Sequence, residues 1–219
     1  MKIVPVTRAR WADLETLFGP NGACAGCWCM WWRLTAGEYT LSKGRPNRDA
    51  LRGIVEASDP PGLLAYDGDT PIGWLAIAPR EDYPRWTKTN AAKESDRALR
   101  ERGIEPPRGV WAATCFYVAR SARRRGVTVA LLEAAVRHAR RHGAKVIEGF
   151  PLVPRSGTVP AAFAWTGFLS AFAAAGFEEV GRPSAGKRVM HYYLGTSSST
   201  TERRAAGSKA SKSASSSRT

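Results

Sequence analysis

The chain has 219 residues, enough for one domain with a sizeable core, and 43% of them are hydrophobic, which is ordinary for a globular protein. The formal net charge of +14 favours a polyanionic partner, either nucleic acid or a ligand with several phosphates. Because the sequence contains no run of eighteen apolar residues and no signal-peptide pattern, a membrane-spanning protein is excluded and a cytoplasmic location is expected.

The first quarter of the chain predicts one strand and two helices. Residues 2–6 alternate in polarity as in a half-buried strand, and apolar residues at helical spacing follow over 10–18. Asn47 is the expected N-terminal cap of a second helix, which should end near Val55.

Residues 22–34, between these helices, concentrate aromatic and sulfur-containing side chains. Trp28, Trp31 and Trp32 all lie within this short segment. Buried against a sheet, the segment would be a short helix; lining a cleft, its tryptophans would form a wall able to hold an amine or a planar ring. We predict a short buried helix, and we name the three tryptophans as candidate substrate-binding residues.

The cysteines and histidines do not predict a metal site. Cys24, Cys27 and Cys29 are close in sequence, but the fourth cysteine lies in a predicted strand, and zinc would need a fourth ligand. Free thiols are expected in a reducing compartment. His138 and His142 are separated by one helical turn and are expected to be solvated residues at a helix end.

The middle of the chain predicts a β-hairpin and a long excursion. Apolar runs over 62–66 and 72–78 flank the turn Asp67-Gly68-Asp69. The charged, proline-containing segment 80–108 predicts a surface excursion with a short helix over 95–102, and excursions of this length are often binding elements.

A predicted buried strand and a predicted amphipathic helix then enclose a cluster of arginines. Residues 110–118 are rich in β-branched and aromatic side chains, as in a buried strand. After Gly126, apolar residues recur at helical spacing until Gly143 ends the helix, and a second buried strand should end near Phe150. The arginines of the cluster are Arg120, Arg123, Arg124 and Arg125.

This arrangement predicts an anion-binding loop. A helix that begins at Gly126 directs its unpaired N–H groups and the positive end of its dipole toward the preceding loop. The arginines strengthen the positive potential, and glycine lets a ligand approach the backbone closely. A phosphate or diphosphate is the expected ligand, and the alternative from these residues alone is an exposed basic turn.

The remaining chain predicts the end of the domain and a tail. The predicted elements are a loop over 151–160, a buried helix over 161–175, and strands over 177–182 and 187–194. The segment 196–219 is rich in Ser, Lys and Arg and nearly free of large apolar residues, which predicts a disordered tail after a single domain over 1–195.

The arginine cluster resembles a known motif. Val118, then Arg123-Arg124-Arg125-Gly126-Val127-Thr128, resembles the coenzyme A loop of the GNAT superfamily of N-acetyltransferases, written Arg/Gln-x-x-Gly-x-Gly/Ala after a hydrophobic strand. The stretch from Phe163 to Phe177 and the run Cys27-Trp28-Cys29-Met30 resemble one bacterial branch of that superfamily. The resemblance covers residues 1–195, and Thr128 departs from it by replacing the usual small residue.

The resemblance implies a fold, an activity and a coenzyme site. The implied fold is α/β (α+β), with a mixed, mostly antiparallel, twisted sheet and helices on both faces. The implied activity is transfer of an acetyl group from acetyl-CoA to a primary amine, on a protein lysine or a small molecule, by direct attack in a ternary complex. The implied coenzyme-binding residues are Phe116, Val118, Arg123, Arg124, Arg125, Gly126, Val127, Thr128 and Trp165.

This chemistry needs a proton acceptor, because an amine like that of lysine has a pKa of about 10.4 and is protonated at neutral pH. Glu148 lies where the family commonly places such a base, and its other interpretation is an ion pair with a nearby basic residue. The Val118 amide is expected to polarise the thioester carbonyl, where its strand splays from the neighbouring strand. Phe172 stands where many relatives carry a tyrosine that protonates the leaving thiolate, so that acid is unidentified.

Two other functions compete with this one. A nucleic-acid-binding module would explain the net charge, but such modules present arginines on a recognition helix or a stacking sheet face, so nucleic acid is not the expected partner. A coenzyme A-binding protein without catalysis is suggested by Thr128 and Phe172. The expected partners are acetyl-CoA and an amine acceptor, without a membrane; the sequence is also compatible with a homodimer.

Overall fold

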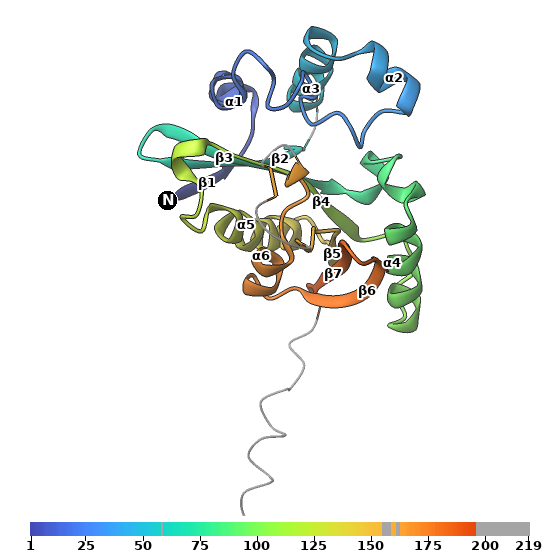
Figure 1. Ribbon diagram of the computed structural model, residues 1–219. Coiled ribbons are helices and arrows are strands. Elements are labelled where there is room, and N and C mark those ends of the chain that lie inside the picture. Colours follow the sequence, from blue (N-terminus) through green and yellow to red (C-terminus); the bar gives the residue numbers. More distant parts are fainter. Residues whose placement is uncertain (58, 155–158, 161–162, 196–219) are drawn as a thin grey trace, which may run out of the picture.

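In the computed structural model, which describes residues 1–57, 59–154, 159–160 and 163–195, the strands of that part of the chain form one twisted sheet of seven (Figure 1). The strands are β1 (Lys2–Pro5), β2 (Gly62–Asp67), β3 (Thr70–Pro79), β4 (Val110–Val118), β5 (Val146–Gly149), β6 (Glu178–Ser184) and β7 (Lys187–Tyr193). Their order is β1-β2-β3-β4-β5-β7-β6, and every neighbouring pair is antiparallel except β4 and β5. The predicted mixed, mostly antiparallel sheet is confirmed.

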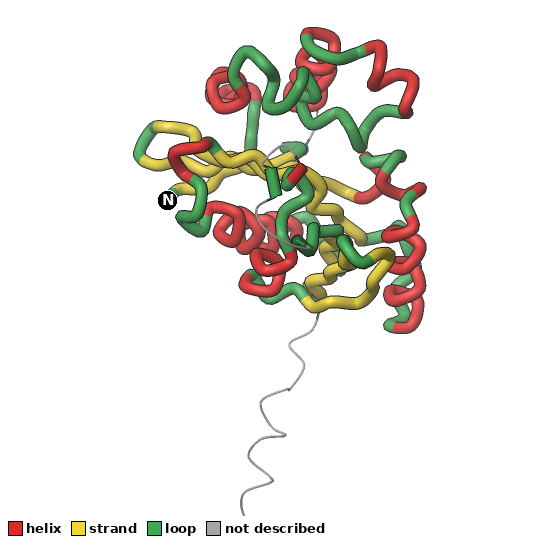
Figure 2. The backbone as a smooth tube through the Cα atoms, in the orientation of Figure 1, coloured by secondary structure: helices red, strands yellow, loops and turns green. Residues whose placement is uncertain are grey.

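Helices cover both faces of the sheet, as predicted (Figures 1 and 2). One face carries α5 (Val127–Arg141) and α6 (Leu169–Ala174), and the other carries α1 (Trp11–Phe18), α2 (Ala36–Leu41) and α3 (Arg45–Ala57). The remaining helix, α4 (Asn90–Glu101), packs against β6 and β7. Short 3-10 helices are η1 (Arg8–Arg10), η2 (Arg80–Asp82), η3 (Trp86–Lys88) and η4 (Arg120–Ala122).

The two faces of the sheet carry separate hydrophobic cores because side chains alternate along each strand. Leu63 of β2 and Leu75 of β3 pack with α5 in one core. Their neighbours Leu64 and Trp74 point the other way and pack with α1 and α3 in the second core. This double burial explains why β2 and β3 read as almost continuous apolar runs, and both strands were predicted correctly.

A β-bulge and an early end of pairing shape β4. Ala76 lies opposite Cys115 while Ile77 lies opposite Ala113, so Thr114 is the extra residue. Within the described residues, β4 pairs with β5 only from Val110 to Ala112, whose partner is Glu148. The C-terminal half of β4 therefore separates from β5, as expected.

The tryptophan-rich segment is irregular, so the predicted short helix over 22–34 is wrong (Figure 2). The backbone there takes positive φ at Gly22 (55°), Gly26 (71°), Trp28 (44°) and Cys29 (53°), which no right-handed helix allows. The capping role of Asn47 is wrong for a related reason. Its side chain is fully buried inside α3 and donates to the Gly26 carbonyl (3.2 Å), which holds this irregular loop in place.

Two further helix predictions fail at their starts. The helix predicted over 161–175 begins only at Leu169 among the described residues. The reason is that the carbonyls of Trp165 and Gly167 accept from Phe116 of β4 and from Leu152, and not from the next turn of a helix. The helix predicted over 95–102 begins at Asn90, where the Thr89 side chain caps it. The segment 80–108 is also not a surface excursion, since Tyr83 and Trp86 are completely buried.

The prediction for one of the two histidines is wrong. His138 is buried against Trp111 (ring centroids 5.6 Å apart), and burial lowers its pKa to about 4, whereas His142 is exposed as expected.

No His, Cys, Asp or Glu cluster in the described part of the chain could hold a metal ion. No helix found there is long and apolar enough to cross a membrane. The predicted tail, 196–219, lies outside the described residues.

Candidate active site

The free edge of β4 forms one wall of the candidate site. The N–H of Phe116 points away from β3 and donates to the Trp165 carbonyl (2.7 Å). Successive N–H groups along a strand point to opposite edges, so residues two apart share an edge. The Val118 amide therefore faces the same side as the Phe116 amide. The edge that separates from β5 thus presents backbone groups to a ligand, with the segment around Trp165 already bonded to its inner end.

The loop before α5 has the geometry of an anion site. Gly126 is the N-cap of α5, with φ of 75°, and no side chain caps the amides of Val127 and Thr128. Arg124 is also left-handed, with φ of 62°. A Cβ at Gly126 would meet nothing within 4 Å, so the space above the helix start is open. Fixed N–H groups and a helix dipole directed into open space favour a bound anion.

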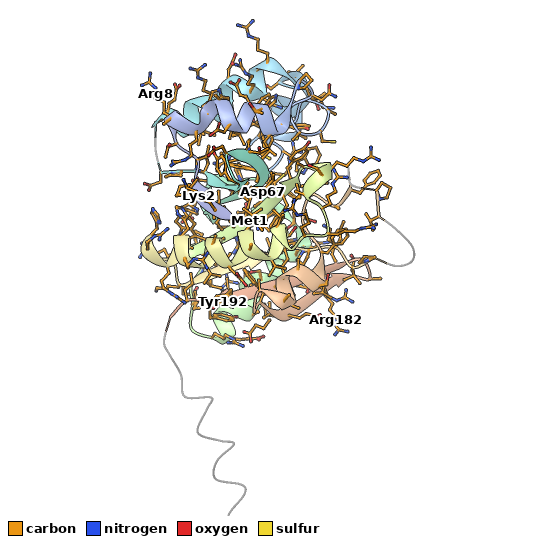
Figure 3. All side chains as sticks on the ribbon, turned by 90° about the vertical axis from the view of Figure 1, so that its left-hand side faces the viewer. Met1, Lys2, Arg8, Asp67, Arg182 and Tyr192 are labelled. Atoms are coloured by element: carbon orange, nitrogen blue, oxygen red, sulfur yellow. The ribbon has the colours of Figure 1, made fainter. Side chains whose placement is uncertain are left out.

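The three arginines of this loop differ in their contacts. Arg123 Nε donates to the Val118 carbonyl (3.2 Å), which ties the loop to the end of β4. Arg125 pairs with Asp67 (2.8 Å), which lies at the hairpin edge of the sheet close to Lys2 (Figure 3). Both partners of that pair are about half exposed, so it adds little stability. All three arginines are exposed and close to the helix start.

Packing of α5 on the sheet fixes the position of this helix start. A Cβ on Gly73 of β3 would lie 2.7 Å from Val127 and 3.3 Å from Leu131, so only glycine allows α5 to approach so closely. Val127 is therefore a core residue, and its expected contact with a coenzyme can be made only through its backbone.

Glu148 is fully buried and lies at the centre of a polar network. Its Oε1 accepts from the indole of Trp86 (2.6 Å) and lies 3.3 Å from Arg80 Nε, and its Oε2 accepts from the hydroxyl of Ser95 (2.5 Å). Arg80 in turn bonds Asp96 (2.5 Å). The Glu148 carboxylate therefore has the ion-pair partner that one interpretation predicts, and it also has the buried surroundings that suit a proton acceptor.

Burial raises the pKa of Glu148 above its ordinary value, and Arg80 and the hydrogen bonds from Ser95 and Trp86 oppose that rise. A carboxylate whose pKa is shifted toward neutrality is a better general base than an exposed one.

The network extends from Glu148 to β7. The Ser95 hydroxyl lies 2.7 Å from His191 Nε2, and His191 Nδ1 lies 2.8 Å from the Tyr193 hydroxyl. If Glu148 is ionised, Ser95 donates to it, so His191 donates from Nε2 and accepts from Tyr193 at Nδ1. Burial lowers the pKa of His191 to about 3, which keeps its ring neutral.

Trp31 and Trp32, two of the three predicted substrate residues, belong to a row of contacting aromatic rings. The last ring of the row, Trp86, hydrogen-bonds Glu148. Trp31 is 37% exposed and lies under the Arg85 guanidinium (4.0 Å from the ring centroid). Its ring meets Trp32 (6.3 Å between centroids), and Trp32 meets Trp86 (4.9 Å) and Trp165 (5.4 Å). Trp165, predicted as a coenzyme residue, therefore contacts the aromatic row, which forms a second wall of the site, through its side chain. Its carbonyl bonds to β4.

Trp28 is not part of this wall. It is only 6% exposed and packs against Trp11 and Phe18 in the core under α1. Close to it, Cys29 and Cys115 are buried free thiols with their sulfurs 3.3 Å apart.

Phe172 offers no proton donor, as the sequence indicated. Its ring is fully buried between Phe116 and Phe177.

The sequence did not indicate the partners of Glu148. Arg80, Trp86, Ser95 and His191 come from η2, η3, α4 and β7, and hydrogen bonds that join the network span 62, 53 and 96 residues of chain. The one local signal is on β7, where a histidine occupies an alternating, core-facing position after Val189.

Comparison with known proteins identifies the family. Residues 28–151 match the model of the acetyltransferase (GNAT) family. This range is more than half of the chain and contains β2 to β5 and α5. The chain therefore belongs to the GNAT acetyltransferase family, and it is an N-acetyltransferase that uses acetyl-CoA as co-substrate. No curated protein matches the chain in sequence.

Several solved structures are similar to this chain. The chain is similar to a protein described as an acetyltransferase (TM-score 0.53, 13% identity, 89% of this chain and 100% of that one covered). It also resembles the ribosomal-protein-alanine N-acetyltransferase of Brucella melitensis (TM-score 0.46, 17% identity, 89% and 100% covered). A third similar structure is the GNAT domain of S. lividans PAT (TM-score 0.46, 16% identity, 88% and 89% covered).

Proposed function

We propose that this protein acetylates a primary amine whose organic part lies against Trp31 and Trp32, with Glu148 as the proton acceptor. The observation that carries the proposal is the row of aromatic rings from exposed Trp31 to Trp86, which hydrogen-bonds Glu148. An aromatic row that leads from solvent to a carboxylate suits a cationic amine with an apolar or flat portion.

The coenzyme is proposed to bind across the start of α5 and along the free edge of β4. The amides that follow Gly126, together with Arg123, Arg124 and Arg125, would hold the diphosphate. The Val118 amide would donate to the thioester carbonyl, where negative charge develops during attack. If pantetheine takes the Phe116 amide as well, it replaces the Trp165 carbonyl that holds this donor in the present structure.

Acetyl transfer then requires the loss of two protons from the amine and one bond exchange. The ammonium first gives one proton to Glu148 in this proposal. The neutral amine then attacks the thioester carbon, the C–N bond forms, the C–S bond breaks with release of the coenzyme A thiolate, and the second proton on nitrogen goes to that thiolate or to solvent. The coenzyme A thiol has an unperturbed pKa of about 8.5, so the thiolate leaves without a dedicated acid, which agrees with Phe172 in the buried core.

The proposal is tested in two steps. Calorimetry should detect binding of acetyl-CoA, and at one hundred times its dissociation constant the coenzyme should stabilise the fold by about 2.7 kcal/mol. ATP, which has phosphates but no pantetheine or thioester, should stabilise it much less. A panel of arylalkylamines, linear alkylamines and lysine peptides is then assayed for release of the coenzyme thiol. Arylalkylamines should give the largest kcat/KM.

Two results would contradict the proposal. Binding of ATP as tight as that of acetyl-CoA would show a general polyphosphate site. Equal kcat/KM for linear and aromatic amines would show that the tryptophans do not line the acceptor pocket, while the coenzyme assignment would stand.

A further inference from the structure

Lys187, the first residue of β7, is a partly buried amine that the proposed reaction does not use. Its Nζ donates to the Phe150 carbonyl (3.2 Å) and to the Thr166 hydroxyl (2.7 Å). Thr166 is itself only 2% exposed. The ammonium group is therefore held at a defined place and does not move freely on the surface.

That place lies between the chain that follows β5 and the 165–167 segment, and these two segments are the walls that the Lys187 amine joins. Phe150 directly follows β5 and supplies the first wall. Thr166 directly follows Trp165, whose carbonyl accepts from the Phe116 amide on the free edge of β4. The Lys187 amine thus bridges the two walls, and two hydrogen bonds and one peptide unit connect it to the strand edge where the thioester is proposed to lie.

The surroundings of Lys187 favour its neutral form. No ion pair to an acidic side chain joins it within the described residues. Burial alone lowers the pKa of Lys187 to about 8, and no neighbouring charged group contributes to the shift. Roughly a tenth of the molecules therefore carry a neutral, nucleophilic amine at pH 7, several hundred times the fraction for an ordinary lysine.

We propose that Lys187 is a self-acetylation site, which takes the acetyl group from acetyl-CoA bound to the same molecule. The inference rests on the coenzyme site of the proposed function. The neutral Nζ attacks the thioester carbon, a C–N bond forms and the C–S bond breaks. The displaced proton goes to the leaving thiolate or to solvent, so the products are N-acetyl-Lys187 and coenzyme A, and no further reactant is needed.

Acetylation would change how the two walls are joined. An acetylated lysine has no charge and a single N–H, so it can donate to the Phe150 carbonyl or to the Thr166 hydroxyl but not to both. The segment that carries Trp165 would lose one of its ties to the end of β5. Because this segment also closes the inner end of the β4 edge, the modification would alter access to the site.

The test needs only the full chain and acetyl-CoA, without an amine acceptor. Intact mass spectrometry should show the gain of one acetyl group, and peptide mapping should place it on Lys187. The first-order rate constant, which is the fraction of protein modified per unit time, should not depend on protein concentration, since the reaction is within one molecule. It should rise as pH approaches 8. Lys187→Arg should abolish this modification, while Lys93→Arg, at an exposed lysine of α4, should leave it unchanged.

A second comparison separates the coenzyme site from simple amine reactivity. Gly126→Val should slow acetylation of Lys187 by acetyl-CoA at least tenfold, but should not change its acetylation by acetic anhydride, which does not use the coenzyme site. Slowing with both reagents would mean that the variant has altered Lys187 itself and would contradict the proposal.

Three results would overturn the proposal. One is unmodified Lys187 in protein that binds acetyl-CoA and acetylates an added amine, a result that leaves the proposed function intact. Another is equal acetylation of Lys93 and Lys187, and the third is an apparent first-order rate constant that rises in proportion to protein concentration. Failure to bind acetyl-CoA at all would instead remove both this proposal and the proposed function.

Discussion

The coenzyme side and the acceptor side of the candidate site are built in opposite ways. The coenzyme side is a single stretch of chain, from Val118 to Thr128, which is exposed at Arg123 to Gly126 and offers largely backbone groups. The acceptor side consists of buried side chains, among them Trp86, Ser95 and Glu148, brought together from distant segments. A site made of backbone groups should therefore tolerate many side-chain changes, whereas a buried polar network depends on each of its members.

The largest expected effect comes from Glu148→Gln. The amide keeps the shape of the side chain but cannot accept a proton, so kcat should fall by about 10² to 10⁴. The loss should shrink at high pH, where the amine loses its proton to solvent. Acetyl-CoA affinity should change by less than a few fold, because the coenzyme side does not contact this network. Steady-state kinetics over a pH series, with calorimetry for affinity, measures both quantities.

Asp96→Asn is the matched control for that variant. Asp96 also pairs with Arg80, but it is not bonded to Trp86 or to the tryptophan row. If Asp96→Asn lowers kcat as much as Glu148→Gln does, the ion-pair network as a whole matters, and Glu148 is a structural partner of Arg80.

Gly126→Val should have the next largest effect, and on the coenzyme side only. Gly126 has φ of 75°, which a branched residue adopts at a cost of about 1–3 kcal/mol, and its backbone is where the diphosphate should approach. Acetyl-CoA affinity should fall at least tenfold while kcat at saturation is preserved. Gly143→Val is the control, because Gly143 ends the same helix with φ of 74° and is equally open. Equal losses of affinity in both variants would mean that helix strain, and not the diphosphate site, is being measured.

Trp31 and Trp28, two of the three tryptophans predicted to bind substrate, should behave differently from each other. Trp31→Ala removes a ring that is 37% exposed, so it should raise the acceptor KM about 5- to 30-fold, the range for loss of a cation–π contact of 1–2 kcal/mol, with little change in stability. Trp28→Ala should instead cost about 3–5 kcal/mol of stability, because that ring is in the core. Urea unfolding and acceptor kinetics distinguish the two outcomes. If Trp28→Ala raises the acceptor KM without destabilising the fold, Trp28 binds the substrate as the sequence predicted.

The smallest effect concerns pH. The folded-state pKa of His191 is about 3, below its ordinary value of 6.5, so between these values the unfolded chain binds the proton and the folded one does not. Stability should therefore fall as pH decreases below 6.5. His191 alone should lower the stability by about 1 kcal/mol between pH 7 and pH 5.5, and the raised pKa of Glu148 acts in the opposite direction. His191→Gln should flatten this dependence in urea unfolding at the two pH values. An unchanged slope would show that other groups, such as His138, control it.

The same contrast explains what the sequence could predict. The strand before Gly126, the helix after it and the arginines between them follow from periodicity and from glycine, because their partners are close in sequence. The separation of β4 from β5 was expected from family resemblance. The network around Glu148 could not be predicted, because Trp86 and His191 reach it only through the tertiary fold. The irregular backbone at Trp28 and Cys29 was also missed, because L-residues rarely take positive φ and nothing in the local sequence indicates that they do so here.

Hydrogen–deuterium exchange with and without acetyl-CoA tests the central claim most directly. The account predicts slower exchange of the amides at 116–118 and 127–129 when acetyl-CoA is bound, and little change over α4, which supplies Ser95 to the buried network. Protection centred on the exposed C-terminal end of α5, or no protection at 116–118 in protein saturated with acetyl-CoA, would contradict it.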